Sequence, residues 1–96
     1  MIHGTTSSGF EFSFEHSVLD DMRLVDEMTV MMTPGVHPSA LLAANSAAAE
    51  LVLGNAQKSA LYEHIGKQNE GRVPTAVFAR ELNEIISSVG KDAEKN

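Results

Sequence analysis

The 96-residue sequence contains no cysteine and no tryptophan. The lack of cysteine excludes disulfide bonds, thiol nucleophiles and cysteine-ligated zinc sites, and a reducing compartment suits such a chain. The sequence also has no run of about 20 apolar residues, which a membrane-spanning helix needs. Its first residues lack the charged and apolar regions of a secretion signal. We therefore expect a cytoplasmic protein that does not bind membranes.

Basic residues are also scarce, because 7 Lys and Arg stand against 13 Asp and Glu, for a formal net charge of −6. The first half carries this imbalance: Arg23 is the only base in residues 1–53. A phosphate backbone would be repelled there. Residues 71–85 have the outline of a helix-turn-helix, but Glu81 and Glu84 lie on its last helix. We expect no nucleic-acid partner.

Motifs for catalysis or metal binding are missing as well. His3, His16, His37 and His64 are far apart in the sequence, and none has a second ligand at helical or short-loop spacing. Serine-nucleophile, phosphate-loop and EF-hand patterns are absent. We predict no enzyme, no metal and no cofactor.

The clearest local pattern near the N-terminus is an alternation of Phe10, Phe12 and Phe14 with polar residues. Such period-two alternation predicts a strand over residues 10–14 with one buried face. Apart from a short segment at residues 29–32, no second strand is evident, so a second subunit or a partner could complete the sheet. We therefore expect self-association and take the three phenylalanines as candidate protein-binding residues.

Helical periodicity and turn residues predict a mainly α fold, a small four-helix domain with a short N-terminal β-strand. The expected helices cover residues 17–31, 38–53, 56–65 and 76–89. A flexible leader is expected over residues 1–9, a single domain over 10–90 and a disordered tail over 91–96. The predicted core contains Leu24, Leu41, Leu61, Phe78, Leu82 and Ile85.

Four of the five methionines lie within the first predicted helix and its end: Met22, Met28, Met31 and Met32. Methionine fills irregular cores and also forms adaptable binding surfaces, and both interpretations stay open for this run. We include these four residues among the candidate protein-binding residues. The alanine-rich segment at residues 43–49 likewise predicts either tight packing inside the chain or an oligomer interface.

Several short motifs occur together in a fixed order. They are Leu19-Asp20-Asp21-Met22, Leu24-Val25, Glu27, Leu53-Gly54, Gln57-Lys58, Leu61, His64-Ile65, Gly71-Arg72-Val73-Pro74, Glu81-Leu82 and Glu84-Ile85. In this order and spacing the chain resembles the tail assembly chaperones of long-tailed, siphovirus-type phages and prophages of Gram-positive bacteria. The resemblance covers about two thirds of the chain. It departs from the family at Asn55-Ala56, where an acidic residue is common.

The resemblance implies a small helical protein of the bacterial host cytoplasm. Such a chaperone coats the tape measure protein and keeps it soluble until tail-tube subunits replace it. The residues alone also suit a different class, a small dimeric regulatory or antitoxin-like protein-binding module. A neighbouring gene for a very long helical protein would favour the chaperone, and a neighbouring toxin gene would favour the module.

The resemblance generates a prediction about the gene. Families of this kind commonly make a longer product by a one-base ribosomal slip near the end of the gene. Glu94-Lys95-Asn96 can be encoded as GAA AAA AAC, which contains the slippery run A AAA AAC. We expect this run in the gene, followed by an open −1 frame. Sequencing the gene checks this, and other codons or a closed frame would exclude this site.

Overall fold

The computed structural model describes residues 1–94, with the side chains of residues 1–89. Two strands, β1 (Ile2–Thr5) and β2 (Glu11–Phe14), precede a 3-10 turn, η1 (His16–Leu19). Three helices follow, α1 (Met22–Met32), α2 (Pro38–Gln68) and α3 (Thr75–Glu94). The predicted mainly helical fold is confirmed, and the predicted strand is observed as β2.

The prediction of a flexible leader over residues 1–9 is wrong. Residues 2–5 form β1, which pairs antiparallel with β2 and places Ile2 opposite Phe14. Ile2 is fully buried, with 0% of its surface exposed. The strand was not recognised because Ile2 is the only large apolar residue among its four residues. The segment at residues 29–32, considered as a possible strand, belongs to α1.

A glycine shapes the contact between the two strands. Gly4 lies opposite Phe12 in the sheet, and a Cβ atom on Gly4 would come within 2.6 Å of the Phe12 ring. Non-bonded carbon atoms normally stay about 3.5–4.0 Å apart, so the ring can lie over β1 only because residue 4 has no side chain. The Phe12 ring of β2 thus supplies most of the apolar surface on this side of β1.

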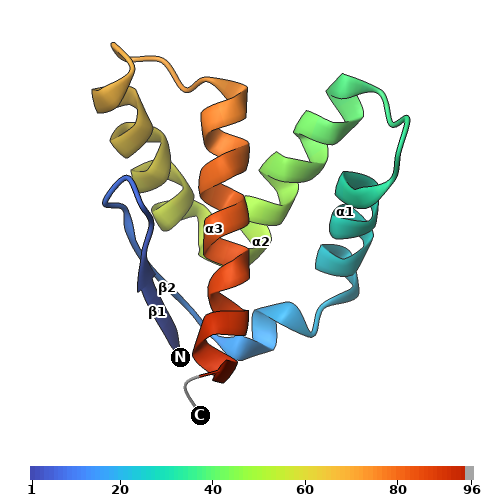
Figure 1. Ribbon diagram of the computed structural model, residues 1–96. Helices are drawn as coiled ribbons and strands as arrows, with labels where there is room; N and C mark the ends of the chain where they lie inside the picture. The colour runs from blue at the N-terminus through green and yellow to red at the C-terminus, as the bar shows by residue number, and fades with distance from the viewer. Residues whose placement is uncertain (95–96) are drawn as a thin grey trace.

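The predicted count of four helices is wrong, because α2 contains both the second and the third predicted helix. The break between them lies at Gly54, whose φ of 78° and ψ of 167° are not helical. This conformation is open essentially only to glycine. The helix resumes directly without a loop, so α2 forms two arms that meet at an angle (Figure 1).

Two helix boundaries also differ from the prediction. The first helix was expected from residue 17, but α1 begins at Met22, because the Asp21 carboxylate caps it by accepting a 2.9 Å bond from the Arg23 N–H. The last helix was expected to end at residue 89, but α3 continues to Glu94. The first four residues of the predicted tail, 91–94, thus belong to α3, and residues 95–96 lie outside the described part.

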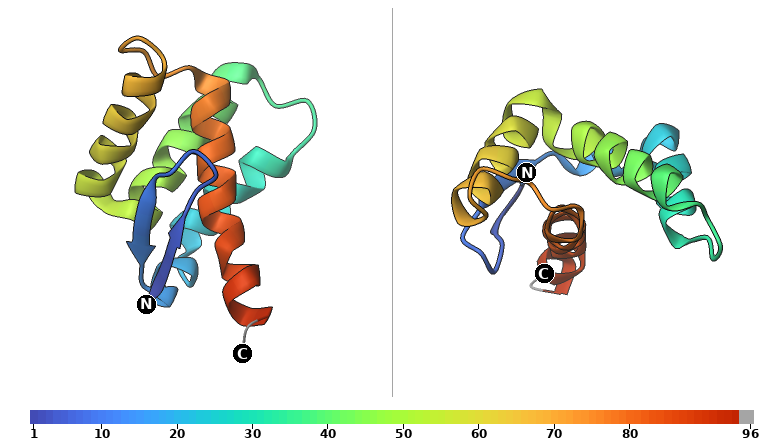
Figure 2. Two further views of the ribbon diagram at one scale, coloured as in Figure 1. Left: turned by 60° about the vertical axis from the view of Figure 1, so that its left-hand side comes forward. Right: turned by 90° about the horizontal axis from the view of Figure 1, so that it is seen from above.

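Helix α3 lies between two sides of the molecule (Figures 1 and 2). The hairpin and the second arm of α2 lie on one side, and the first arm of α2 with α1 on the other. The predicted core residues Leu24, Leu61, Phe78, Leu82 and Ile85 are buried. Leu41 is only half-buried, because it precedes the first buried residue of α2, Ala44, by almost one turn and lies near the helix start.

The first arm of α2, against which α1 packs, contains three buried alanines. Ala44, Ala48 and Ala49 are at most 2% exposed, and α1 packs against α2. Helices approach more closely where the contacting side chains are small. Packing inside the chain therefore accounts for at least these members of the alanine-rich segment.

A substitution of Ile2 tests whether the N-terminal residues are part of the fold. We expect Ile2→Ala to lower the free energy of unfolding by about 2–5 kcal/mol, because it leaves a cavity under the hairpin. His3→Ala is the control, since His3 is exposed on the same strand, and it should change stability by about 0.5 kcal/mol or less. Urea unfolding followed by circular dichroism measures both. Equal stability of the two variants would contradict the placement of β1.

Candidate functional site

The three phenylalanines proposed for protein binding are not at the surface. Phe10, Phe12 and Phe14 are only 6%, 6% and 4% exposed, and all three belong to the hydrophobic core. The strand that they predict finds its partner in β1, within the same chain. The structure thus removes the reason for expecting strand sharing between subunits.

The four methionines divide into two pairs. Met28 and Met31 are half-buried and pack against the core. Met22 and Met32 are 68% and 79% exposed, near opposite ends of α1. The core-filling interpretation therefore holds for Met28 and Met31, whereas Met22 and Met32 remain at the surface, where protein binding stays a prediction.

The exposed methionines share one side of α1 with two further exposed residues. Val25 is 42% exposed, and Thr29 is exposed as well. With Met22 and Met32 they follow helical spacing and share one side of α1. The Thr29 hydroxyl donates a 2.8 Å bond to the Val25 carbonyl, so its polar atom already has a partner within the helix. We call Met22, Val25, Thr29 and Met32 the α1 face.

The α1 face lies at the end of the molecule opposite the hairpin, where α1 packs on the first arm of α2 (Figures 1 and 2). Exposed apolar groups gathered on one helix are characteristic of interaction surfaces in small proteins. Met22 and Met32 have flexible side chains that can adapt to different apolar shapes. This face is therefore the best candidate for binding another protein.

Acidic residues surround the α1 face. Asp20 and Asp26 are exposed, and Asp21 caps the helix. Arg23 is the only base nearby in sequence, and its guanidinium lies 2.7 Å from the Asp21 carboxylate. The hydrogen bonds from Arg23 lower the pKa of Asp21, and the same side-chain bond raises the pKa of Arg23. Because the single base is paired, the surroundings of the face present negative charge.

Apart from the α1 face, an apolar hollow lies between the arms of α2 and the start of α3. It has a volume of about 340 Å³ and is lined by Leu42, Asn45, Ser46, Tyr62, Val73, Thr75 and Phe78. Lys58 lies at its edge, where its ammonium donates a 2.8 Å bond to Ser46 and sits 5.8 Å from the Tyr62 ring centre. This hollow mixes apolar and polar groups and lacks the uniform charge that surrounds the α1 face.

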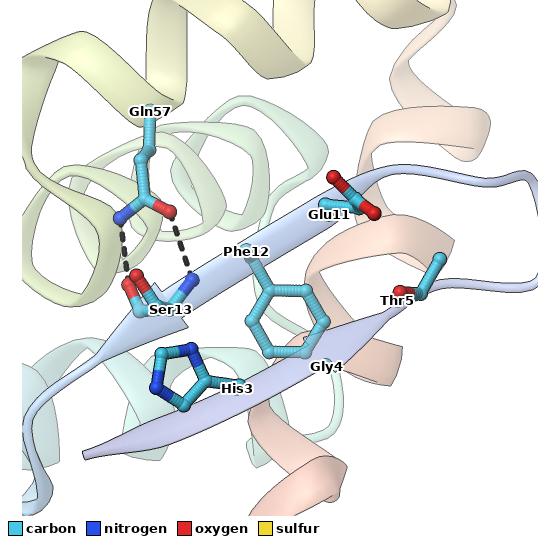
Figure 3. A pocket seen from close by; sticks show the side chains of 7 residues that line it. All are labelled: His3, Gly4, Thr5, Glu11, Phe12, Ser13 and Gln57. Atoms are coloured by element: carbon cyan, nitrogen blue, oxygen red, sulfur yellow. Dashed lines mark hydrogen bonds between the residues drawn. The ribbon is translucent and has the colours of Figure 1, made fainter.

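Another hollow, of about 460 Å³, lies over the hairpin and is lined mainly by polar groups such as His3, Glu11 and Ser13 (Figure 3). Gln57 closes the outer edge of β2 here. Its amide oxygen accepts a 2.9 Å bond from the Ser13 N–H, and its nitrogen donates a 2.7 Å bond to the Ser13 carbonyl. A side chain thus occupies the backbone groups that an added strand would need.

The most deeply buried polar group is Glu81 on α3, which is 0% exposed. Its Oε1 atom accepts 2.8 Å bonds from the hydroxyls of Thr6 and Ser8 in the hairpin turn. His64 Nε2 lies 3.0 Å from the Ser8 hydroxyl oxygen. The adjacent turn residue Ser7 bonds to Glu84 through its N–H, and hydrogen bonding from Ser7 lowers the pKa of that carboxyl. These contacts fasten the turn to α2 and α3.

A serine, a histidine and a glutamate side by side invite comparison with a hydrolase triad. In a triad the histidine takes the proton of the serine, and the carboxylate orients the histidine. Here the Ser8 proton goes to Glu81, so His64 must donate its own Nε2 proton to Ser8 rather than accept one. The arrangement therefore holds the turn in place and does not activate Ser8.

Among the side chains of residues 1–89, no three His, Asp or Glu are close enough together to hold a metal ion. No helix within residues 1–94 combines the length and apolarity that crossing a bilayer requires. Comparison of the chain with models of protein families, with curated proteins and with solved structures found no match.

The turn contacts can be tested with two threonines of the hairpin. Thr6→Val should lower the free energy of unfolding by about 1–3 kcal/mol, because a buried carboxylate oxygen and the Phe10 N–H each lose a partner. Thr5→Val makes the same chemical change at an exposed position and should be within about 0.5 kcal/mol of the parent. Chemical denaturation measures both, and a neutral Thr6→Val would show that the Thr6 hydroxyl does not help to hold the turn.

Proposed function

We propose that this protein is a tail assembly chaperone that binds the tape measure protein of its phage or prophage and keeps it soluble in the host cytoplasm. The observation that carries the proposal is the exposed, flexible apolar α1 face on a small acidic domain. The α1 face supports the expectation raised by the resemblance in sequence, because it provides a surface suited to binding the tape measure protein.

A protein that shields another from aggregation must do two things. It must cover apolar surface, and the complex must repel other complexes. The α1 face, with its two exposed methionines, is suited to the first task because methionine can repack against varied apolar shapes. The formal net charge of −6 is suited to the second, since like charge keeps particles apart in solution.

The same surface explains how such binding could be temporary. The α1 face has only three large exposed apolar side chains, Met22, Val25 and Met32. A small interface of this kind gives weak or transient binding. Tail-tube protein, the second expected partner, could then replace the chaperone along the tape measure protein without having to overcome a tight complex.

Co-expression tests the proposal. Produced with the tape measure protein encoded in the same genome, this chain should increase the soluble fraction of that protein and co-purify with it. Changing Met22 and Met32 together to serine should abolish co-purification. Leu42→Ser is the matched control, because Leu42 is 42% exposed but lies on α2. A tape measure protein that is equally soluble with and without the chain would contradict the proposed function.

A further inference from the structure

The residues of the α1 face have a particular spacing. Met22, Val25, Thr29 and Met32 are separated by three, four and three positions. This is the repeat of the a and d positions of a coiled coil, where each side chain inserts between those of a facing helix. In α1 these positions are turned to solvent, at 68%, 42% and 79% exposure for Met22, Val25 and Met32. The helix thus presents a coiled-coil seam of about two heptads without a facing helix.

Thr29 would be the one polar residue in this seam. Its hydroxyl is bonded to the Val25 carbonyl at 2.8 Å, so docking of an apolar surface would not leave that oxygen without a partner. The methyl group of the side chain is then the part available to a facing helix. The seam can therefore be covered by apolar side chains along its whole length.

Charges beside a coiled-coil seam determine which helix can pair with it. With Met22 and Val25 at a and d, Asp21 and Asp26 occupy the flanking g and e positions of the first heptad, while the same positions of the second heptad are held by the uncharged Met28 and Thr33. The guanidinium of Arg23 lies 2.7 Å from the Asp21 carboxylate. Arg23 therefore does not neutralise the charge of Asp26. A second copy of α1 would bring further acidic flanks against these, whereas lysine or arginine would complement them.

We infer that the α1 face binds one amphipathic helix of the partner, with apolar residues at a and d spacing and basic residues beside them. The inference deepens the proposed function and rests on it for the identity of the partner, but not for the chemistry of the bound helix. Helix α1 has 11 residues, which span about 16 Å. Each copy would therefore cover about three turns of the partner.

A synthetic peptide supplies the probe. It has three heptads with leucine at a and d and lysine at e and g, and a fluorescent label reports binding by anisotropy. A scrambled peptide of identical composition controls for charge alone, and a peptide with glutamate at e and g controls for sign. We expect the heptad lysine peptide to bind the full chain about tenfold more tightly than either control at physiological salt.

Variants of the chain locate the binding surface. The double change Met22→Ser with Met32→Ser should weaken binding of the lysine peptide about tenfold, while Leu42→Ser should leave it within about twofold. Asp26→Lys should weaken binding of the lysine peptide and strengthen binding of the glutamate peptide. Circular dichroism of each variant checks that the fold is intact, which is expected because all four side chains are exposed.

Three outcomes would overturn the inference. Equal binding of the lysine and scrambled peptides would show attraction by charge alone. An unchanged affinity in the double variant would place the binding site elsewhere. A dimer seen in analytical ultracentrifugation that the double variant abolishes would show that a second copy covers the α1 face. If the peptide results hold but the tape measure protein is not retained, the proposed function fails and the inference stands.

Discussion

The attachment of the hairpin to the helices depends on one buried carboxylate, that of Glu81. A carboxylate is placed in the interior at a high cost in free energy unless hydrogen bonds replace its water shell. Thr6 and Ser8 provide such bonds to its Oε1 atom from the hairpin turn, and His64 holds Ser8 from α2. Among the described residues, the buried Oε2 atom has no hydrogen-bond partner. The N-terminal strand pair, the middle helix and the last helix therefore meet at one polar point inside an apolar core. The hairpin cannot leave α3 without exposing its phenylalanines and stranding Glu81.

Elements that show a pattern within their own residues could be predicted, whereas elements that depend on contacts with distant parts of the chain could not. The alternation of Phe10, Phe12 and Phe14 predicted strand β2, and Gly54 predicted the break between the two arms of α2. Strand β1 gave no such signal, because its inner face consists of Ile2 and of Gly4, which is covered by the Phe12 ring. Its existence depends on a contact with another strand, which no local pattern reveals. Glu81 looked like a surface residue for the same reason: its partners lie more than 70 positions earlier in the chain.

The candidate site was predicted in part. Sequence reasoning selected the methionines of the first helix, but Leu24, Met28 and Met31 make the neighbouring side of that helix apolar as well. With apolar residues on two sides, periodicity cannot tell which side faces the core. The contact with the alanines of α2 decides it, and this leaves Met22 and Met32 outside. Thr29 is polar and so did not count toward an apolar stripe, although its spacing from Val25 and Met32 places it on the same side of the helix.

The amide of Gln57 has a consequence for how the protein ages. Its nitrogen donates to the carbonyls of both Ser13 and Leu53, while its oxygen accepts from the Ser13 N–H. Only an uncharged amide can satisfy all three groups. Deamidation to glutamate would turn an anionic oxygen toward two carbonyl oxygens, at the place where β2 meets the bend of α2. Deamidation of Gln57 would therefore expose the edge of β2 and weaken the bend of α2 at the same time. An exposed strand edge can pair with another chain, so the deamidated protein would tend to aggregate.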